Sequence, residues 1–201
     1  MKTKQIYLLL LAATLFILPA NRASAAMTPL AIGIVPPVQF PPSNFDIVGL
    51  RASVIYGNHR SVSGIDIGII GNMTEVSFTG IAVAGGFNRN KGKATILGLQ
   101  LAGIANLNME KTGVYGLQAA LVNYNKAESH VVGVQFAAAN LAKETTIYGI
   151  QAGVYNNART VNGFQIGLVN MTQNLHGLQI GLVNFNHNGL FKVAPILNVG
   201  F

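Results

Sequence analysis

The sequence contains few side chains that could do chemistry, and its most suggestive stretch is GFNRNKGKAT at residues 86–95. A P-loop has four residues between its glycines and a Ser or Thr directly after its Lys, so that backbone amides surround the phosphate and the hydroxyl reaches magnesium. Here five residues separate Gly86 from Gly92, and Ala94 follows Lys93. We therefore interpret this stretch as a basic turn.

Metal binding and acid–base catalysis also lack residues at suitable spacings. No histidine has a partner at ligand spacing such as HExxH. The few carboxylates are scattered along the chain, whereas acid–base chemistry uses groups that converge. These residues are His59, His130, His176 and His187, and Asp46, Asp66, Glu75, Glu110, Glu128 and Glu144. We expect no catalytic residue, no metal and no cofactor, and hence a protein that is not an enzyme.

Residues 1–26 have the pattern of a secretory signal peptide. Two lysines precede an apolar run over residues 6–19, and AlaSerAla follows at residues 23–25. This pattern predicts export and cleavage after Ala25 or Ala26. Retention as a membrane anchor is the alternative, but the run is shorter than the roughly 20 residues of a spanning helix.

Beyond this leader the chain is poor in charge and has no cysteine. The formal net charge of the chain is +7, and loss of residues 1–26, with three cations and no acid, leaves +4. The remaining cations stand singly in polar connectors, without the clustering or interleaved aromatic residues of a nucleic-acid surface. The absence of cysteine excludes disulfides and thiol chemistry. Nucleic acid is therefore not an expected partner.

Nine similar units make up most of the chain, and two of them stand side by side in GFQIGLVNMTQNLHGLQIGLVN at residues 163–184. Each unit begins at a glycine, recurs after 14 to 18 residues, and has an apolar side chain two positions before that glycine. The repeat glycines are Gly49, Gly64, Gly80, Gly98, Gly116, Gly133, Gly149, Gly163 and Gly177. The apolar residues are Ile47, Val62, Phe78, Ile96, Val114, Val131, Ile147, Val161 and Leu175.

Two amide side chains also recur. Six units carry Gln two positions after the glycine: Gln100, Gln118, Gln135, Gln151, Gln165 and Gln179. Every unit then reaches an asparagine: Asn58, Asn72, Asn88, Asn106, Asn123, Asn140, Asn156, Asn170 and Asn184. The first three units are looser copies, because Arg51, Asp66 and Ala82 stand at the Gln position.

Apolar residues alternate with other residues within each unit, which predicts β-strands. A single unit cannot fold alone. Burial of four or five aliphatic side chains contributes roughly 1.5–3 kcal/mol each, whereas ordering the residues of a unit costs about 1.5 kcal/mol per residue. Neighbouring units must therefore share strands and a core.

Two arrangements satisfy this requirement. The first and favoured one is a parallel β-solenoid of about nine coils of 14–18 residues, in which identical amides lie about 4.8 Å apart and can bond one another and the turning backbone. The alternative is a small antiparallel outer-membrane β-barrel of about 10 strands, because about ten residues suit a tilted membrane strand and the chain ends in an alternating segment closed by Phe201. The similar connectors favour the solenoid, because barrel turns alternate between short and long.

The solenoid carries two further expectations. A bend at each glycine would turn inward both the apolar residue two positions before it and the one directly after it. The Gln, Gly and Val residues between the aliphatic ones would then form a flat, weakly polar, exposed face. Stacked Gln side chains can stabilise a parallel sheet without any ligand, and the same face could bind a sugar or a protein.

The tandem GLQIGLVN-type units, together with VIYGN at residues 54–58 and PILNVGF at residues 195–201, resemble the bacterial surface-repeat proteins of the type first described from leptospires. The similarity extends over roughly residues 30–201. It implies export and surface display, but no activity that can be assigned to a residue.

These observations divide the chain into a cleaved leader (1–26), a Pro-rich N-terminal cap (27–48), tandem β repeats (49–188) and a C-terminal strand or cap (189–201). We expect a non-enzymatic exported protein at the cell surface, outer membrane or periplasm of a bacterium, acting as a structural or interaction module. Candidate partners are another protein, a surface glycan, a second copy of the chain, or the outer membrane. The barrel alternative predicts a structural element or narrow channel.

Overall fold

A computed structural model describes residues 26–201, so the leader predicted at residues 1–26 lies outside the described residues except for Ala26. The described chain consists of strands and turns without a helix. The strands are β1 (Met27–Val35), β2 (Val38–Phe40), β3 (Asp46–Ser53), β4 (Tyr56–Gly68), β5 (Gly71–Ala84), β6 (Phe87–Asn90), β7 (Lys93–Ala102), β8 (Ala105–Asn108), β9 (Thr112–Asn125), β10 (Ser129–Ala152), β11 (Tyr155–Ile166), β12 (Val169–Asn186) and β13 (Val193–Gly200). No helix long and apolar enough to cross a membrane occurs among residues 26–201.

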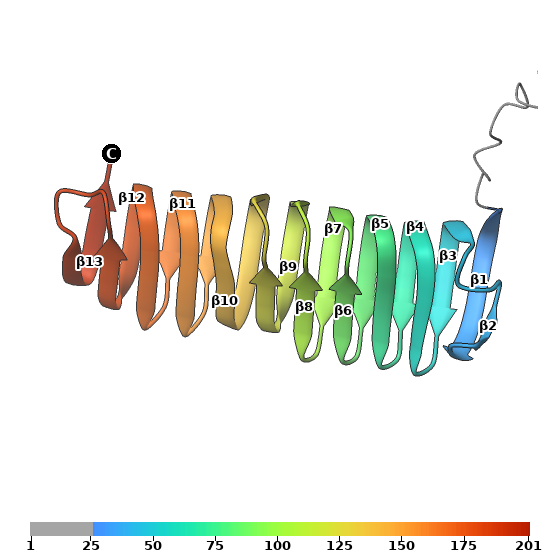
Figure 1. The fold of residues 1–201 in the computed structure, drawn as a ribbon. Helices are drawn as coiled ribbons and strands as arrows, with labels where there is room; N and C mark the ends of the chain where they lie inside the picture. Colours follow the sequence, from blue (N-terminus) through green and yellow to red (C-terminus); the bar gives the residue numbers. More distant parts are fainter. Residues whose placement is uncertain (1–25) are drawn as a thin grey trace, which may run out of the picture.

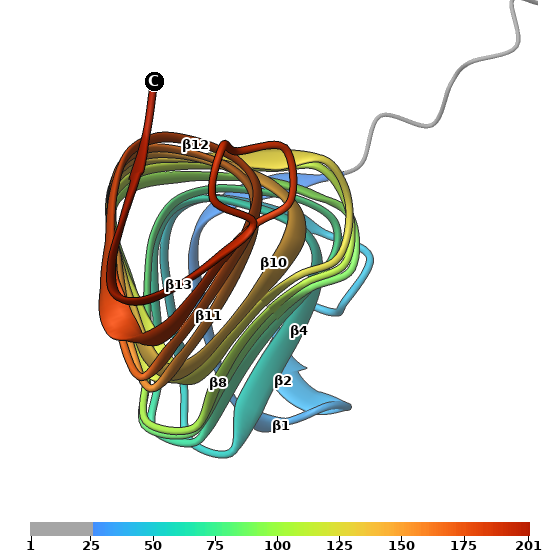
Figure 2. The ribbon, with the colours of Figure 1, turned by 90° about the vertical axis from the view of Figure 1, so that its left-hand side faces the viewer.

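The strands wind into a parallel β-solenoid of about ten turns (Figure 1). Successive units pair in parallel and in repeat register: Gly116 pairs with Gly133, and Gly163 with Gly177. Seen along the axis, the coils superpose as closed loops around a narrow interior (Figure 2). The predicted parallel solenoid is confirmed, and the antiparallel barrel arrangement is wrong for the described chain. One turn beyond the predicted nine arises because β1 pairs in parallel with β3, ahead of the first unit.

The repeat glycines adopt backbone angles that only glycine tolerates well. Eight of them have φ between +126° and +147°, and a Cβ on each of the eight would overlap a carbonyl oxygen of the preceding turn. The exception is Gly98, with φ +99°, where the nearest atom to such a Cβ is 3.7 Å away. It lies in a bulge, because Gly80 pairs with Ile96 and Ala82 with Gln100.

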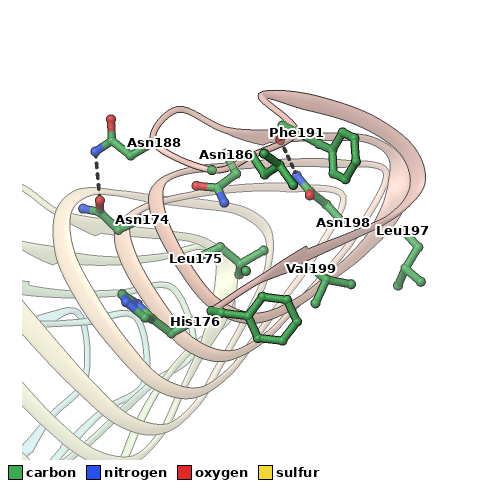
Figure 3. A pocket seen from close by; sticks show the side chains of 13 residues that line it. Asn174, Leu175, His176, Asn186, Asn188, Phe191, Leu197, Asn198 and Val199 are labelled. Atoms are coloured by element: carbon green, nitrogen blue, oxygen red, sulfur yellow. Dashed lines mark hydrogen bonds between the residues drawn. The ribbon is translucent and has the colours of Figure 1, made fainter.

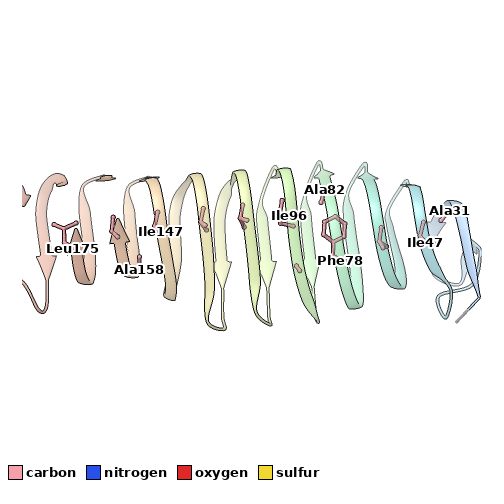
Figure 4. Close-up of a cluster of buried hydrophobic side chains, with 13 residues drawn as sticks. Ala31, Ile47, Phe78, Ala82, Ile96, Ile147, Ala158 and Leu175 are labelled. Carbon is pink, nitrogen blue, oxygen red and sulfur yellow. The ribbon is translucent and has the colours of Figure 1, made fainter. Parts of the chain in front are cut away.

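The side chains do not divide between interior and exterior as predicted. The apolar residues two positions before the glycines are buried and stack along the rod axis (Figure 4). The residues directly after the glycines point outward: Ile65 is 45% exposed and Phe164 is 44% exposed. The expectation that both would point inward is wrong, because alternation continues through the glycine and breaks only at the turn five to six positions later.

The amides therefore lie inside the solenoid and aliphatic side chains cover its outside. All six Gln side chains at the second position are fully buried, so the exposed Gln face expected from the sequence is also wrong. One asparagine was misplaced as well: Gly57, not Asn58, pairs with Asn72.

The two ends of the stack differ from its middle. At the N-terminal end β2 folds back antiparallel onto β1, within residues 27–48. At the C-terminal end β13 runs antiparallel to β12, within residues 189–201. Each end thus departs from the repeat and finishes the ladder of parallel strands.

The glycine geometry predicts two different outcomes for one substitution. Gly133→Ala introduces both an unfavourable φ and an overlap with the Gly116 carbonyl, so we expect loss of more than about 3 kcal/mol of unfolding free energy. Gly98→Ala introduces strain without overlap and should lose about 1–3 kcal/mol. Urea denaturation followed by circular dichroism measures both losses. Equal losses would contradict the role assigned to close backbone approach.

Buried amide ladders and the candidate interaction surface

The glutamines form one continuous hydrogen-bonded ladder inside the solenoid. Each Nε2 donates to Oε1 of the glutamine one turn earlier, from Gln118 to Gln100 (2.8 Å) up to Gln179 to Gln165 (2.7 Å). The intermediate rungs, at Gln135, Gln151 and Gln165, measure 2.7–2.8 Å. Asn198 of β13 closes the ladder by donating to Gln179 (3.2 Å).

A second ladder of asparagines runs at the turn, and its amides point the other way. Each Nδ2 donates to Oδ1 of the asparagine one turn later, over distances of 2.8–3.0 Å. The ladder consists of Asn72, Asn88, Asn106, Asn123, Asn140, Asn156, Asn170 and Asn184. The same Nδ2 also donates to a backbone carbonyl of the next turn, such as Asn106 to Ala119 (3.0 Å) and Asn170 to Ile180 (2.9 Å).

The ladders resolve the main energetic problem of this interior. A buried amide without a partner costs about 1–3 kcal/mol, and the ladders avoid that loss in their middle turns. At their ends the Oδ1 atoms of Asn72 and Asn198 are buried without a partner among residues 26–201. In the middle turns a shorter column stacks beside the Gln ladder and consists of Asn90, Asn108 and Asn125. Gln100 exchanges two 3.2 Å hydrogen bonds with Asn108. Each amide finds its hydrogen-bond partners only when neighbouring turns stack in register. The buried amides therefore specify the register of the strands.

The Gln ladder is replaced at the N-terminal end by a buried ion pair. Arg51 and Asp66 occupy the Gln position in two adjacent turns, and their side chains are each 1% exposed. The guanidinium contacts the carboxylate twice, at 2.8 Å from Nε and 2.5 Å from Nη2, and donates to the Met73 carbonyl (2.8 Å). Burial raises the pKa of Asp66, and the positive charge of Arg51 opposes that shift.

His59 connects this ion pair to the N-terminal cap. Its Nε2 lies 3.0 Å from the Pro41 carbonyl oxygen and its Nδ1 lies 3.4 Å from Arg51 Nη1. A neutral ring that donates from Nε2 and accepts at Nδ1 satisfies both contacts. Burial lowers the pKa of His59 to about 4. The hydrogen bond to the Pro41 carbonyl opposes this pKa shift, and the positive charge of Arg51 adds a smaller lowering.

The other side chains considered for chemistry do not converge. Among residues 26–201 no three His, Asp or Glu side chains lie together as metal ligands would. The stretch that resembles a P-loop runs through β6 into β7, and its Lys91 pairs with Glu75 of the previous turn (2.8 Å). His130 instead contacts the Tyr115 hydroxyl (2.7 Å).

A groove at the C-terminal end of the stack has little chemistry in it (Figure 3). Its wall includes His176 and Phe201, and Asn188 donates to Asn174 (2.8 Å). The buried Oδ1 atoms of Asn186 and Asn198 have no hydrogen-bond partner within the described chain. His176 is its one titratable side chain. This groove offers no acid–base pair.

The outer side of the repeat strands is unusually apolar. We define the apolar face as the positions one, three and five after each repeat glycine. In all nine units these positions hold only aliphatic residues, Phe, Ala or Gly, without one charge or hydroxyl. Exposure is high at several of them, with Ile69 at 67%, Phe136 at 57% and Leu182 at 66%.

The apolar face is large for a single surface patch. Eight spacings of about 4.8 Å between nine turns and four spacings of about 3.3 Å between five strand residues give roughly 38 Å by 13 Å, or about 500 Å². The largest apolar patch of a typical monomer covers about 300–600 Å² and often has a function, so the apolar face lies in the upper part of that range. The face also continues onto β1 through Ile32 and onto β13 through Leu197, which are 56% and 50% exposed.

The chain matches no protein-family model, no curated protein and no solved structure. The resemblance to surface-repeat proteins thus stays a prediction from the repeat motif. The sequence pattern did not predict that this face is exposed, although its signal, the uncharged positions one, three and five after each glycine, occurs in every unit.

Because the amides lie inside and aliphatic side chains lie outside, substitutions at two adjacent residues should change the unfolding free energy by very different amounts. Gln135→Leu adds an apolar side chain inside but leaves the Gln118 acceptor and a Gln151 donor without their ladder partner, so we expect loss of about 2–5 kcal/mol. Phe136→Ser removes an apolar side chain from the surface and should change stability by less than about 1 kcal/mol. Thermal unfolding of both variants tests this. The reverse ranking would mean that the interior has been assigned incorrectly.

His59 predicts a pH dependence of stability. Because the pKa is about 4 in the folded chain and ordinarily 6.5, the unfolded chain binds more protons between these values, and stability is complete above pH 6.5 and decreases toward pH 4. The loss from this residue amounts to roughly 3 kcal/mol at most. In urea titrations at pH 7 and pH 4.5, His59→Gln should show a smaller pH difference than the unmodified chain. An unchanged difference would remove His59 as its source.

Proposed function

We propose that this protein is a non-enzymatic, exported interaction module: a stiff rod that binds an apolar partner surface along its apolar face. The observation that carries the proposal is the uncharged outer side of nine consecutive turns. Apolar patches of this size are often interaction surfaces.

The architecture supports a binding role in a second way. The apolar face lies on strands joined by continuous backbone pairing and by the two amide ladders, so its side chains occupy a fixed, repeating grid. A fixed grid loses little conformational entropy on binding. Flatness and repetition suit an extended partner surface better than a small ligand, which is normally enclosed in a cleft.

Export and surface display are proposed from the sequence. The leader pattern of residues 1–26 and the resemblance to surface-repeat proteins support them. The absence of cysteine is compatible with an oxidising compartment, where free thiols react.

The proposal predicts that polar substitutions on the apolar face remove binding while leaving the fold intact. A variant with Ile67→Ser, Phe136→Ser, Ile166→Thr and Ile180→Thr should elute from a phenyl-substituted chromatography matrix at markedly higher salt than the unmodified chain, because retention reports accessible apolar surface. Its circular dichroism spectrum should be unchanged.

A matched control carries four substitutions of cationic residues outside the apolar face, Lys111→Ser, Lys126→Ser, Lys143→Ser and Arg159→Ser, and should elute with the unmodified chain. Equal retention of all three proteins would contradict the proposal. So would a turnover that depends on a single connector carboxylate.

A further inference from the structure

The apolar face continues around the turn that follows position five. Ile55, Ile70 and Ile104 lie on the far side of this turn and are 40%, 47% and 62% exposed. At these three turns the apolar surface is therefore convex, whereas in the last five units the same position is half-buried, as at Val122 and Val183. A flat partner can cover only one side of such an edge.

Polarity increases away from this turn along both strands. On the repeat strand, the position directly before the glycine holds residues of several types, including Tyr115 and Tyr148. The third position before the glycine is mainly Ser, Thr, Asn or His. On the returning strand, Arg89 stands near the turn, and the third position after the asparagine is charged in five of the nine units, at Glu75, Lys91, Lys126, Lys143 and Arg159. The tyrosines thus lie between apolar and charged zones, where amphipathic aromatic side chains are favoured at membrane interfaces.

The backbone of the turn needs no water. Its amides donate to carbonyls of the preceding turn, as Ile70 does to Val54 (3.1 Å) and Leu168 to Val154 (3.0 Å). From inside, the Asn ladder donates to carbonyls at position three of the apolar face, including those of Val83, Leu101, Ala119, Phe136, Ala152, Ile166 and Ile180. A backbone that enters hydrocarbon must be satisfied within the protein, and this edge meets that condition.

We propose that the partner of the apolar face is a phospholipid bilayer, with the rod lying along the membrane and its convex apolar edge inserted into one leaflet. This inference rests on the proposed function and names its partner. The apolar positions extend at most about 13 Å along the strand, which fits within one leaflet of a hydrocarbon core about 30 Å thick. The charged connectors stay on the aqueous side.

A second copy of the chain fits these observations less well. Two copies packed face to face would bury the outer strands, as two sheets of a sandwich do, but would leave Ile55, Ile70 and Ile104 on the far side of the turn exposed. A fluid hydrocarbon phase covers a convex edge along its whole length.

The test uses single tryptophans as depth probes, because the chain contains no Trp. The full chain is made as Ile69→Trp, near the N-terminal end of the rod, as Leu182→Trp, near its C-terminal end, and as Lys126→Trp on a connector. Each is mixed with neutral phosphatidylcholine vesicles, with and without bromine on the acyl chains, and its fluorescence is recorded after flotation. The leader is identical in all three proteins, so the differences report the rod alone.

We expect Ile69→Trp and Leu182→Trp to shift to shorter wavelength and to lose at least half of their emission to bromine, and Lys126→Trp to change little. Flotation should persist at 0.5 M salt, because insertion is driven by apolar surface and not by lipid charge. Equal quenching at all three sites, or quenching at only one end, would overturn the proposed orientation.

Failure of the lipid inference can be separated from failure of the proposed function. A chain that does not float but forms a chemically cross-linkable dimer, lost in the Ile67, Phe136, Ile166 and Ile180 variant, overturns the bilayer as partner and leaves the interaction module standing. A folding check by circular dichroism accompanies every variant. If Ile69→Trp does not fold, Ile70→Trp, at a residue that is 47% exposed, replaces it at the same turn.

Discussion

The structure depends on the hydrogen bonding of buried side-chain amides. A glutamine or asparagine in the interior is stable only when its donors and acceptor have partners, and an identical amide one turn away provides them. The Gln ladder donates toward the N-terminus and the Asn ladder toward the C-terminus. Parallel, in-register stacking follows from this requirement, because a shift by one residue would place every amide against a different neighbour.

The same constraint determines the surface. Amides fill most of the narrow interior, beside one column of apolar residues. The remaining aliphatic side chains therefore lie on the outside. The Asn ladder also satisfies backbone carbonyls at the apolar edge, so a polar core and an apolar exterior are two aspects of one arrangement. This coupling connects the fold to the proposed role at an apolar boundary.

The sequence predicted the repeat, the strands, the parallel stacking and the positions of the ladder amides, because period and identity are properties of the chain itself. The sequence did not predict which side chains face the interior. Alternation in a strand defines two sets of residues but not which set faces inward, and ordinary hydrophobicity assigned Leu178 and Ile180 to the core and Gln179 to the surface. The ion pair of Arg51 with Asp66 was also missed, although both stand at the Gln position, where burial of one member implies burial of the others.

The most direct test of the central claim is hydrogen exchange of the side-chain amides, followed by nuclear magnetic resonance. If the ladders are buried and continuous, the side-chain NH₂ protons of Gln135 and Asn140 exchange orders of magnitude more slowly than those of an exposed amide such as Asn188, and they show through-space contacts to Gln118 and Asn123. Rapid exchange at Gln135 and Asn140, without those contacts, would place the amides outside and contradict the account.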